Sequence, residues 1–149
     1  MGTAWAWYAL SPNFSGLWPS ATNNARPYSD MTVLNVHGQP TLKKIAILMT
    51  DGDYNTQYCN GLDSGYGVNC NGNAYNADSQ TQAGSLCTNM KAKGIEVYTI
   101  GAQVSTNAKN FLKSCATDAN HYYDATDGTK LHQAFIDIAY KLVQPYLAH

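Results

Sequence analysis

The feature that most constrains this chain is a short, unbroken apolar run that ends in two carboxylates. Residues 45–49 read IAILM, follow two lysines, and lead through Thr50 into Asp51, Gly52 and Asp53. An apolar run of this length is typical of a strand that is buried on both faces of a parallel sheet. The two aspartates then lie at the carboxyl end of that strand, where open α/β sheets bind their ligands.

Helical and strand-like patterns alternate after this run. Apolar residues recur with the spacing of one helix face in three segments, and two short segments between them have the composition of strands. In chain order these five segments are 83–90, 95–101, 108–115, 121–125 and 131–142. Gly94 is placed to end the first helix and Asp127 to cap the last. The alternation predicts an α/β fold with right-handed crossovers, a mainly parallel sheet and helices on its faces.

The 149 residues are enough for one domain. We expect residues 1–12 to be the end of a helix and residues 13–42, which contain proline, serine, asparagine and glycine, to be a long irregular connection. Residues 43–149 carry the alternation of strands and helices. A loop insertion rich in tyrosine, asparagine and glycine interrupts it at 54–76.

The composition argues against nucleic-acid and lipid ligands. Charged residues make up 13% of the chain, about half of the usual share of roughly 25%, and the net charge is −1. No basic patch is available for phosphate backbones or anionic lipids. No apolar stretch reaches the roughly 18 residues of a membrane span, and residues 1–10 do not resemble a signal peptide. We therefore expect an export signal, if there is one, to lie upstream of residue 1.

Four cysteines indicate the compartment. Cys59 and Cys70 bracket a loop with few residues that can pack, and none of the four has the C-x₂₋₄-C spacing of a zinc site. Cys87 and Cys115 fall on the inner faces of two predicted helices, which allows them to meet if these helices cover the same side of the sheet. Two disulfides would place the protein in an oxidising compartment. Four free, buried thiols in a cytosolic protein are the alternative.

The chemistry available to Asp51 is open to several interpretations. It can serve as a turn carboxylate that accepts hydrogen bonds from nearby backbone amides. With Asp53 it copies the first positions of a calcium-binding loop, but Thr56 replaces the required glycine and Leu62 the bidentate glutamate.

An aspartate-nucleophile phosphatase of the haloacid dehalogenase type is another interpretation. In it, Asp51 would be the nucleophile and Asp53 the general acid, with Mg²⁺ between them. Lys113 and Asp124 are available as the downstream lysine and carboxylate, but the second acidic pair of such enzymes is missing.

Several motifs in order resemble a known family. The stretch ILMTDGDYNT, followed by IEVYTIGA and YYDAT, is similar to the second half of a von Willebrand factor A (VWA) domain, a Rossmann-like three-layer sandwich. The resemblance extends to TadG-like proteins of tight-adherence (Flp) pilus assembly. It rests on AWAWYALSPNF, KKIAILMTDGDYNTQYC, LCTNMKAKGIEVYTIG, FLKSCATDANHYYDAT and LHQAFIDIAYKL, which together cover nearly the whole chain.

This resemblance implies roles for particular residues. Asp51 corresponds to the third-loop ligand of the family's metal-ion-dependent adhesion site, and Cys87 and Cys115 to a disulfide pair. The D-x-S-x-S loop that completes the site is absent. The resemblance therefore implies a partial VWA domain that lacks the first strand and its neighbours, either as a fragment of a longer gene product or as a degenerate domain. We expect Mg²⁺ binding only in a full-length domain, and weak or no divalent-metal binding here.

The resemblance also predicts function and behaviour. It implies a non-enzymatic binding or assembly module, periplasmic or otherwise extracytoplasmic, anchored by an upstream helix, with pilus or envelope proteins as partners. Because the family's first strand is missing, the strand at 44–50 should have an unpaired edge and an uncovered apolar face. We expect the isolated chain to be marginally stable, dimeric or aggregation-prone, unless residues 13–42 cover the gap.

Overall fold

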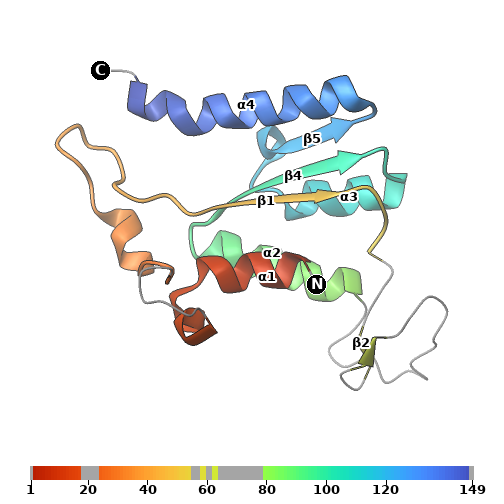
Figure 1. Cartoon of the computed structure of the whole chain (residues 1–149), viewed down its shortest axis with the longest axis horizontal. Coiled ribbons are helices and arrows are strands. Elements are labelled where there is room, and N and C mark those ends of the chain that lie inside the picture. Colours follow the sequence, from red (N-terminus) through yellow and green to blue (C-terminus); the bar gives the residue numbers. More distant parts are fainter. Residues whose placement is uncertain (1, 18–23, 55–57, 60–61, 64–78, 148–149) are drawn as a thin grey trace.

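The chain folds into an α/β domain around a three-stranded parallel sheet (Figure 1). The computed structural model describes residues 2–17, 24–54, 58–59, 62–63 and 79–147. The strands lie in the order β1-β4-β5, with bounds β1 Ile45–Thr50, β4 Glu96–Ala102 and β5 Tyr122–Ala125. The α/β class and the parallel sheet agree with the sequence prediction.

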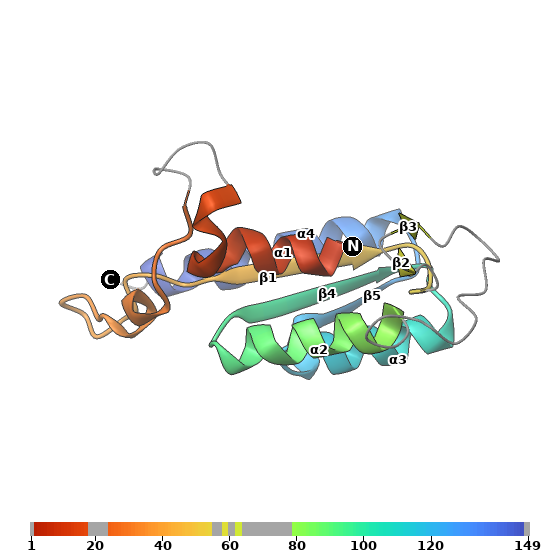
Figure 2. The ribbon, with the colours of Figure 1, turned by 90° about the horizontal axis from the view of Figure 1, so that it is seen from below.

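Helices flank both faces of this sheet (Figure 2). The bounds are α1 Gly2–Leu10, α2 Ser79–Ala92, α3 Thr106–Cys115 and α4 Gly128–Leu147. Helices α2 and α3 lie on one face, and α1 packs against α2 and β1 at the border of the same face. Helix α4 lies on the opposite face, over β5 and β4. Among the described residues, no helix is long and apolar enough to cross a membrane.

Local sequence signals set the helix ends. Gly94 has φ +76°, its N–H donates to Lys91 O, and the N–H of Ile95 donates to Met90 O, which is a Schellman ending of α2. Asp127 caps α4, because its carboxylate accepts the N–H of Lys130 at 2.9 Å. Both ends were predicted from the sequence.

The larger core lies between the sheet and α2 and α3. Its buried apolar side chains come from alternate positions of β1 and β4 and from the inner faces of the two helices: Ala46, Leu48, Val97, Ala83, Cys87, Met90, Ala108, Phe111, Leu112 and Cys115. Thr99 is fully buried there and donates its hydroxyl to Leu112 O at 2.9 Å, so its polar group is satisfied. The apolar residues with helical spacing in the predicted segment 108–115 are all buried: Ala108, Phe111, Leu112 and Cys115.

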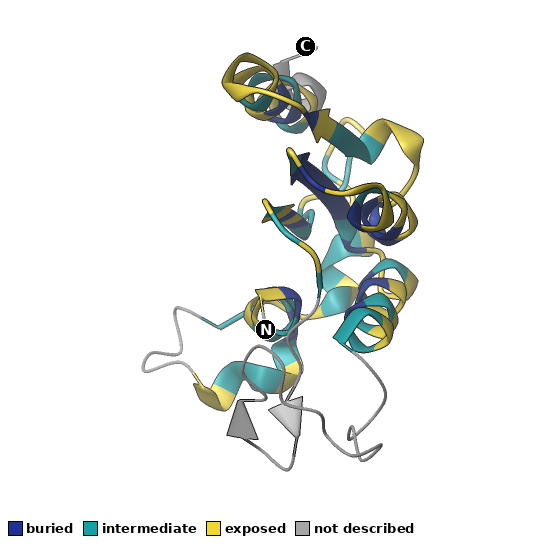
Figure 3. Ribbon diagram, turned by 90° about the vertical axis from the view of Figure 1, so that its right-hand side faces the viewer, coloured by how far each residue is buried: buried dark blue, intermediate teal, exposed yellow. Residues whose placement is uncertain are grey.

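The smaller core lies under α4. Tyr98 and Ile100 of β4 pack there with Ala125, Ala134 and Ile138. Figure 3 looks along the strands and shows β4 buried, whereas β1 is partly exposed. Helix α4 covers β4 and β5 and leaves the corresponding face of β1 open.

The prediction from the apolar run that β1 is buried on both faces is therefore wrong, whereas the unpaired edge and uncovered apolar face that the family resemblance predicted for this strand are present. Ile47 is 41% exposed and Met49 is 55% exposed. The physical reason is the strand order, which places β1 at an edge of the sheet, away from α4. The helical spacing at 131–142 also places Phe135 on the apolar face of α4, yet its side chain is 44% exposed.

The segment predicted as irregular, 13–42, has some regular structure. It contains the 3₁₀ helices η1 Pro12–Leu17 and η3 Tyr28–Thr32, and an isolated bridge between Leu34 and Pro40. Its described part from residue 24 onward lies beyond the N-terminal end of β1 and leaves the free edge of the strand uncovered (Figure 1).

A buried lysine joins this segment to the domain. Lys44 is 5% exposed, donates from Nζ to Leu10 O at 2.6 Å, and lies 5.2 Å from the centre of the Tyr28 ring. It thus caps the last turn of α1, and its burial lowers the pKa of the ammonium group below the usual value.

Most of the predicted insertion at 54–76 lies outside the described residues. The described part holds two short antiparallel strands, β2 Tyr58–Cys59 and β3 Leu62–Asp63. Tyr54, the first residue of the range, belongs to the domain instead, because its ring packs on Phe111 with the centroids 4.4 Å apart. The remaining short element is the 3₁₀ helix η4, Ala119–His121, which leads into β5.

Candidate functional site

The carboxyl ends of the three strands border an open cavity of about 430 Å³. Its lining comes from the ends of β1, β4 and β5 and from the start of α4: Asp51, Ala102, Gln103, Ala125, Asp127, Gly128 and Leu131. Gln103 has φ +56°, a left-handed conformation that non-glycine residues rarely adopt, and its N–H donates to Ala125 O. Sequence reasoning placed Asp51 here and did not find Gln103, because no local pattern marks its backbone conformation.

A tight turn orients Asp51 towards solvent. The hydroxyl of Thr50 donates to Gly52 O at 3.0 Å, and the N–H of Gly52 donates back to Thr50 Oγ1 at 3.2 Å. These two bonds close the turn across Asp51, which stays exposed. Within the described part of the chain, Asp51 makes no hydrogen bond or ion pair, so its carboxylate is available to a ligand.

Asp53 is occupied by a structural contact. Its carboxylate accepts the hydroxyl of Ser105 at 2.6 Å. Ser105 is the N-cap of α3, since its Oγ accepts the N–H of Ala108 at 3.2 Å. The pair therefore ties the loop after β1 to the start of α3. A serine directly before a helical pattern is the sequence signal that identifies such a cap.

The second carboxylate of the cavity, that of Asp127, also accepts a hydrogen bond within the protein. The N–H of Lys130 donates to Asp127 and holds the pKa of that carboxyl below its usual range. Asp127 is therefore ionised and engaged as the cap of α4 at neutral pH.

The described residues do not fit a Mg²⁺ site. Mg²⁺ requires a near-octahedral shell of oxygens, and here Asp51 offers one free carboxylate while Asp127 caps a helix. Among the described residues, no group of three or more His, Cys, Asp or Glu side chains is placed to hold a metal ion.

The residues of the phosphatase interpretation make separate contacts. Lys113 extends over the ring of Tyr122, with Nζ 5.4 Å from its centre. Asp124 pairs with Lys109 at 2.9 Å. Among the described residues, Lys113 forms no ion pair with Asp51.

One of the two predicted disulfides is present in the described region. Cys87 of α2 and Cys115 of α3 are bonded, with their Cα atoms 5.2 Å apart and both side chains buried. This agrees with their predicted positions on inward helix faces. The second pairing, Cys59 with Cys70, lies outside the described residues, since the structure does not describe Cys70.

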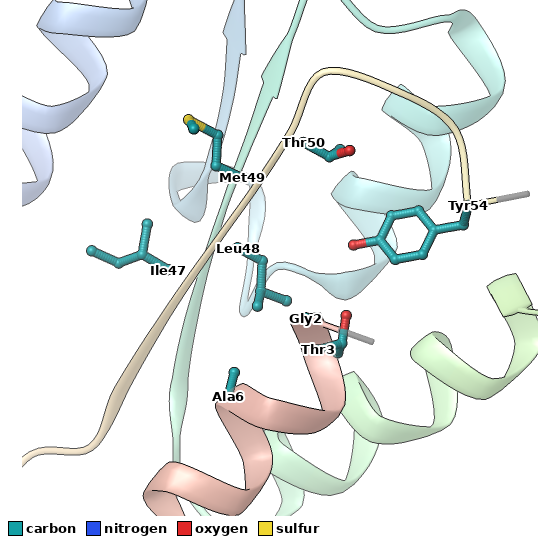
Figure 4. Close-up of a pocket in the computed structure, with 8 residues that line it drawn as sticks. All are labelled: Gly2, Thr3, Ala6, Ile47, Leu48, Met49, Thr50 and Tyr54. Atoms are coloured by element: carbon teal, nitrogen blue, oxygen red, sulfur yellow. The ribbon is translucent and has the colours of Figure 1, made fainter. Parts of the chain in front are cut away.

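A second cavity follows the free edge of β1 (Figure 4). Its volume is about 300 Å³, and its lining is uncharged: Gly2, Thr3, Ala6, Ile47, Leu48, Met49, Thr50 and Tyr54. In the close-up, Leu48 and Thr50 lie on the side of α1, while Ile47 and Met49 point away from it. We call this cavity the edge groove.

The comparison with solved structures agrees with this architecture. No protein-family model and no curated protein matches the chain. Among solved structures, the chain is similar to part of the pilus adhesin SpaC from Lactobacillus rhamnosus GG, with a TM-score of 0.50 and 18% identity. The match covers 78% of this chain and 18% of the adhesin.

At 18% identity, this similarity establishes only that the chain and the adhesin segment share a fold. The chain is thus a Rossmann-like α/β domain with a three-stranded parallel sheet. A fold of this kind also forms part of a pilus adhesin, of which the present chain spans 18% of the length.

Proposed function

We propose that this chain is a non-enzymatic protein-binding module of a TadG-like pilus-assembly protein, built on part of a VWA-type domain. The observation that carries the proposal is the shared fold with a segment of a pilus adhesin. The T-D-G turn at the end of β1 and the order of the surrounding motifs support the same assignment.

The contacts of the acidic residues support a binding role over catalysis. Asp53 is engaged with Ser105, and Asp127 caps α4. A phosphatase needs its nucleophile, general acid, lysine and metal ligands gathered around one phosphate. Among the described residues, Asp51 is the one of these three carboxylates that makes no hydrogen bond or ion pair, which suits a single polar contact to a partner.

The disulfide supports a location outside the cytoplasm. Bonds such as Cys87–Cys115 form and persist in oxidising compartments and are rare in cytosolic proteins. The proposed partners are accordingly pilus or envelope proteins at the cell surface or in the periplasm.

Deletion of the gene in its natural host tests the assignment. Loss of surface pili in electron micrographs, restored by the intact gene, is the expected result. Normal piliation in the deletion strain would contradict it.

A colorimetric assay tests the absence of catalysis. We expect the purified chain to hydrolyse p-nitrophenyl phosphate in the presence of Mg²⁺ no faster than an Asp51→Asn variant. Hydrolysis that depends on Asp51 would show that the protein is an enzyme.

A further inference from the structure

A small hairpin projects from the domain at the N-terminal ends of the strands. In residues 33–41 the chain folds back on itself: an antiparallel bridge joins Leu34 to Pro40, and the N–H of Thr41 donates to Val33 O at 2.8 Å. Figures 1 and 2 both place the segment that contains it, residues 24–42, beyond the start of β1. We call residues 33–41 the tip hairpin.

The apolar side chains of the tip hairpin are exposed. Val36, at the turn, is 95% exposed, and Val33 and Leu34 are 52% and 58% exposed. Single exposed apolar residues are common on soluble proteins, but a group of them on one projecting turn indicates a surface that binds something apolar. Residues 31–42 contain no acidic residue.

The backbone of the turn is satisfied within the hairpin. The side-chain Oδ1 of Asn35 accepts the N–H of His37 at 2.9 Å and that of Gln39 at 3.0 Å. The N–H of Gly38, which has φ +74°, donates to Asn35 O at 3.0 Å. A turn whose N–H groups are already bonded loses little when it leaves water. The tip hairpin is therefore built so that it can enter an apolar or interfacial layer.

Basic residues gather at the same end of the sheet. They lie in the segment before β1, at the ends of α2 and α3, and beside the start of β5. They are seven of the nine basic residues in the chain: Arg26, Lys43, Lys44, Lys91, Lys93, Lys113 and Lys141. The described acidic residues at this end are Asp30, Glu96 and Asp118, so the end is positive.

Three of these lysines are available to an external anion. Lys93, Lys113 and Lys141 are exposed, and within the described part of the chain none of them forms an ion pair. Lys93 lies beside η3, which leads into the tip hairpin, with its Nζ 5.9 Å from the centre of the Tyr28 ring. The apolar turn and the unpaired lysines thus share one end of the domain.

The opposite end of the sheet is acidic. Its charged residues include four carboxylates and two ammonium groups: Asp51, Asp53, Asp124, Asp127, Lys109 and Lys130. A negatively charged surface therefore attracts the end that carries the tip hairpin and repels the end that carries the Asp51 cavity. Such a surface would orient the domain with the hairpin towards it.

We infer that the tip hairpin docks on an anionic lipid bilayer, with Val33, Leu34 and Val36 in the headgroup region and the neighbouring lysines at the lipid phosphates. Peripheral membrane binding combines buried apolar area with the attraction of basic residues in this way. The inference goes beyond the proposed pilus function. Docking would hold the domain at the envelope with the Asp51 cavity directed away from the lipid.

The chemistry of the surface favours lipid over a protein partner. Protein interfaces concentrate their binding energy in Trp, Tyr and Arg, whereas Leu and Val are under-represented there. The exposed apolar residues of the tip hairpin are valine and leucine, and the unpaired cations are lysines. The sequence showed no basic patch, because the net charge is −1 and the fold brings these lysines together from separate segments.

Co-sedimentation with lipid vesicles tests the inference. The purified full chain is mixed with vesicles of phosphatidylglycerol and phosphatidylethanolamine, or of phosphatidylcholine alone, at low and at high salt. We expect the chain to partition onto the anionic vesicles about tenfold or more better than onto the neutral ones. High salt should weaken this preference, because it screens the lysines.

Two variants and two matched controls locate the contact. Val36→Asp should weaken binding to anionic vesicles by about tenfold or more, and so should Lys93→Glu, because each lysine near such a surface contributes about fivefold. Met49→Asp and Lys130→Glu make the same kinds of change at the opposite end of the sheet and should leave binding unchanged. Melting curves show whether each variant is folded.

Equal binding to neutral and anionic vesicles, or binding to neither, would overturn the inference. So would a loss in Met49→Asp as large as that in Val36→Asp, because the exposed face of β1 would then be the lipid contact. Capture of a soluble envelope protein through Val36, without vesicle binding, would replace the bilayer with a protein partner. The deletion phenotype judges the pilus assignment separately, so the two proposals can fail independently.

Discussion

Removal of the Cys87–Cys115 disulfide should destabilise the domain by a predictable amount. The bond joins residues that are 28 positions apart, so it restricts a loop of that length in the unfolded chain. Loop-closure entropy for such a loop corresponds to about 3.5 kcal/mol at 25 °C. For 149 residues at roughly 2.1 cal/mol/K each, the unfolding entropy is about 0.3 kcal/mol/K. Loss of loop closure alone should therefore lower the melting temperature by about 11 °C, and the packing lost in the Cys87→Ala/Cys115→Ala variant brings its total decrease to about 14 °C.

The assay compares wild type and variant by circular dichroism melts, each with and without reductant. Both sulfurs are buried, so the alanine pair also removes some packing, about 1 kcal/mol. The reducing arm separates the two effects. In reductant, the melting temperature of the wild type should fall to within about 3 °C of that of the variant, because only the packing difference between the two proteins remains. If the difference in melting temperature between wild type and variant were the same with and without reductant, the loop-closure reasoning would be refuted and the lost stability would be due to packing.

Three further predictions concern single side chains. Gly101→Ala should cost about 1–3 kcal/mol by urea unfolding, because its Cβ would lie 2.7 Å from Val104 Cγ2, whereas Gly128→Ala, with open space around it, should not destabilise the fold. Burial lowers the pKa of Lys44 in the folded protein, so the unfolded chain binds more protons between that pKa and the ordinary lysine value of 10.5, and stability rises with pH in that range. The melting temperature of wild type minus that of Lys44→Met should therefore increase from about pH 8 to about pH 10; a flat difference would contradict the shift. Ser105→Ala should lose about 1 kcal/mol through its helix cap, and an unchanged urea midpoint would show that the cap contributes nothing.

The sequence by itself determined the order of strands and helices and several of their ends. Gly94 and Asp127 act on groups only a few residues away, so their effects can be predicted without knowledge of the fold. The helical spacing that turned Cys87 and Cys115 inward is equally local, and it was enough to suggest that they meet.

Only the tertiary structure decided which faces are covered and which polar groups are free. The apolar run of β1 by itself predicts burial on both sides, and the uncovered face was expected only from the family resemblance, because the exposure depends on the strand order and on how far α4 reaches across the sheet. Asp53 looked like a catalytic partner of Asp51 because the two are close in sequence. In the structure its carboxylate instead accepts a hydrogen bond from Ser105, 52 positions away. Such outcomes depend on contacts between distant parts of the chain, which no local pattern encodes.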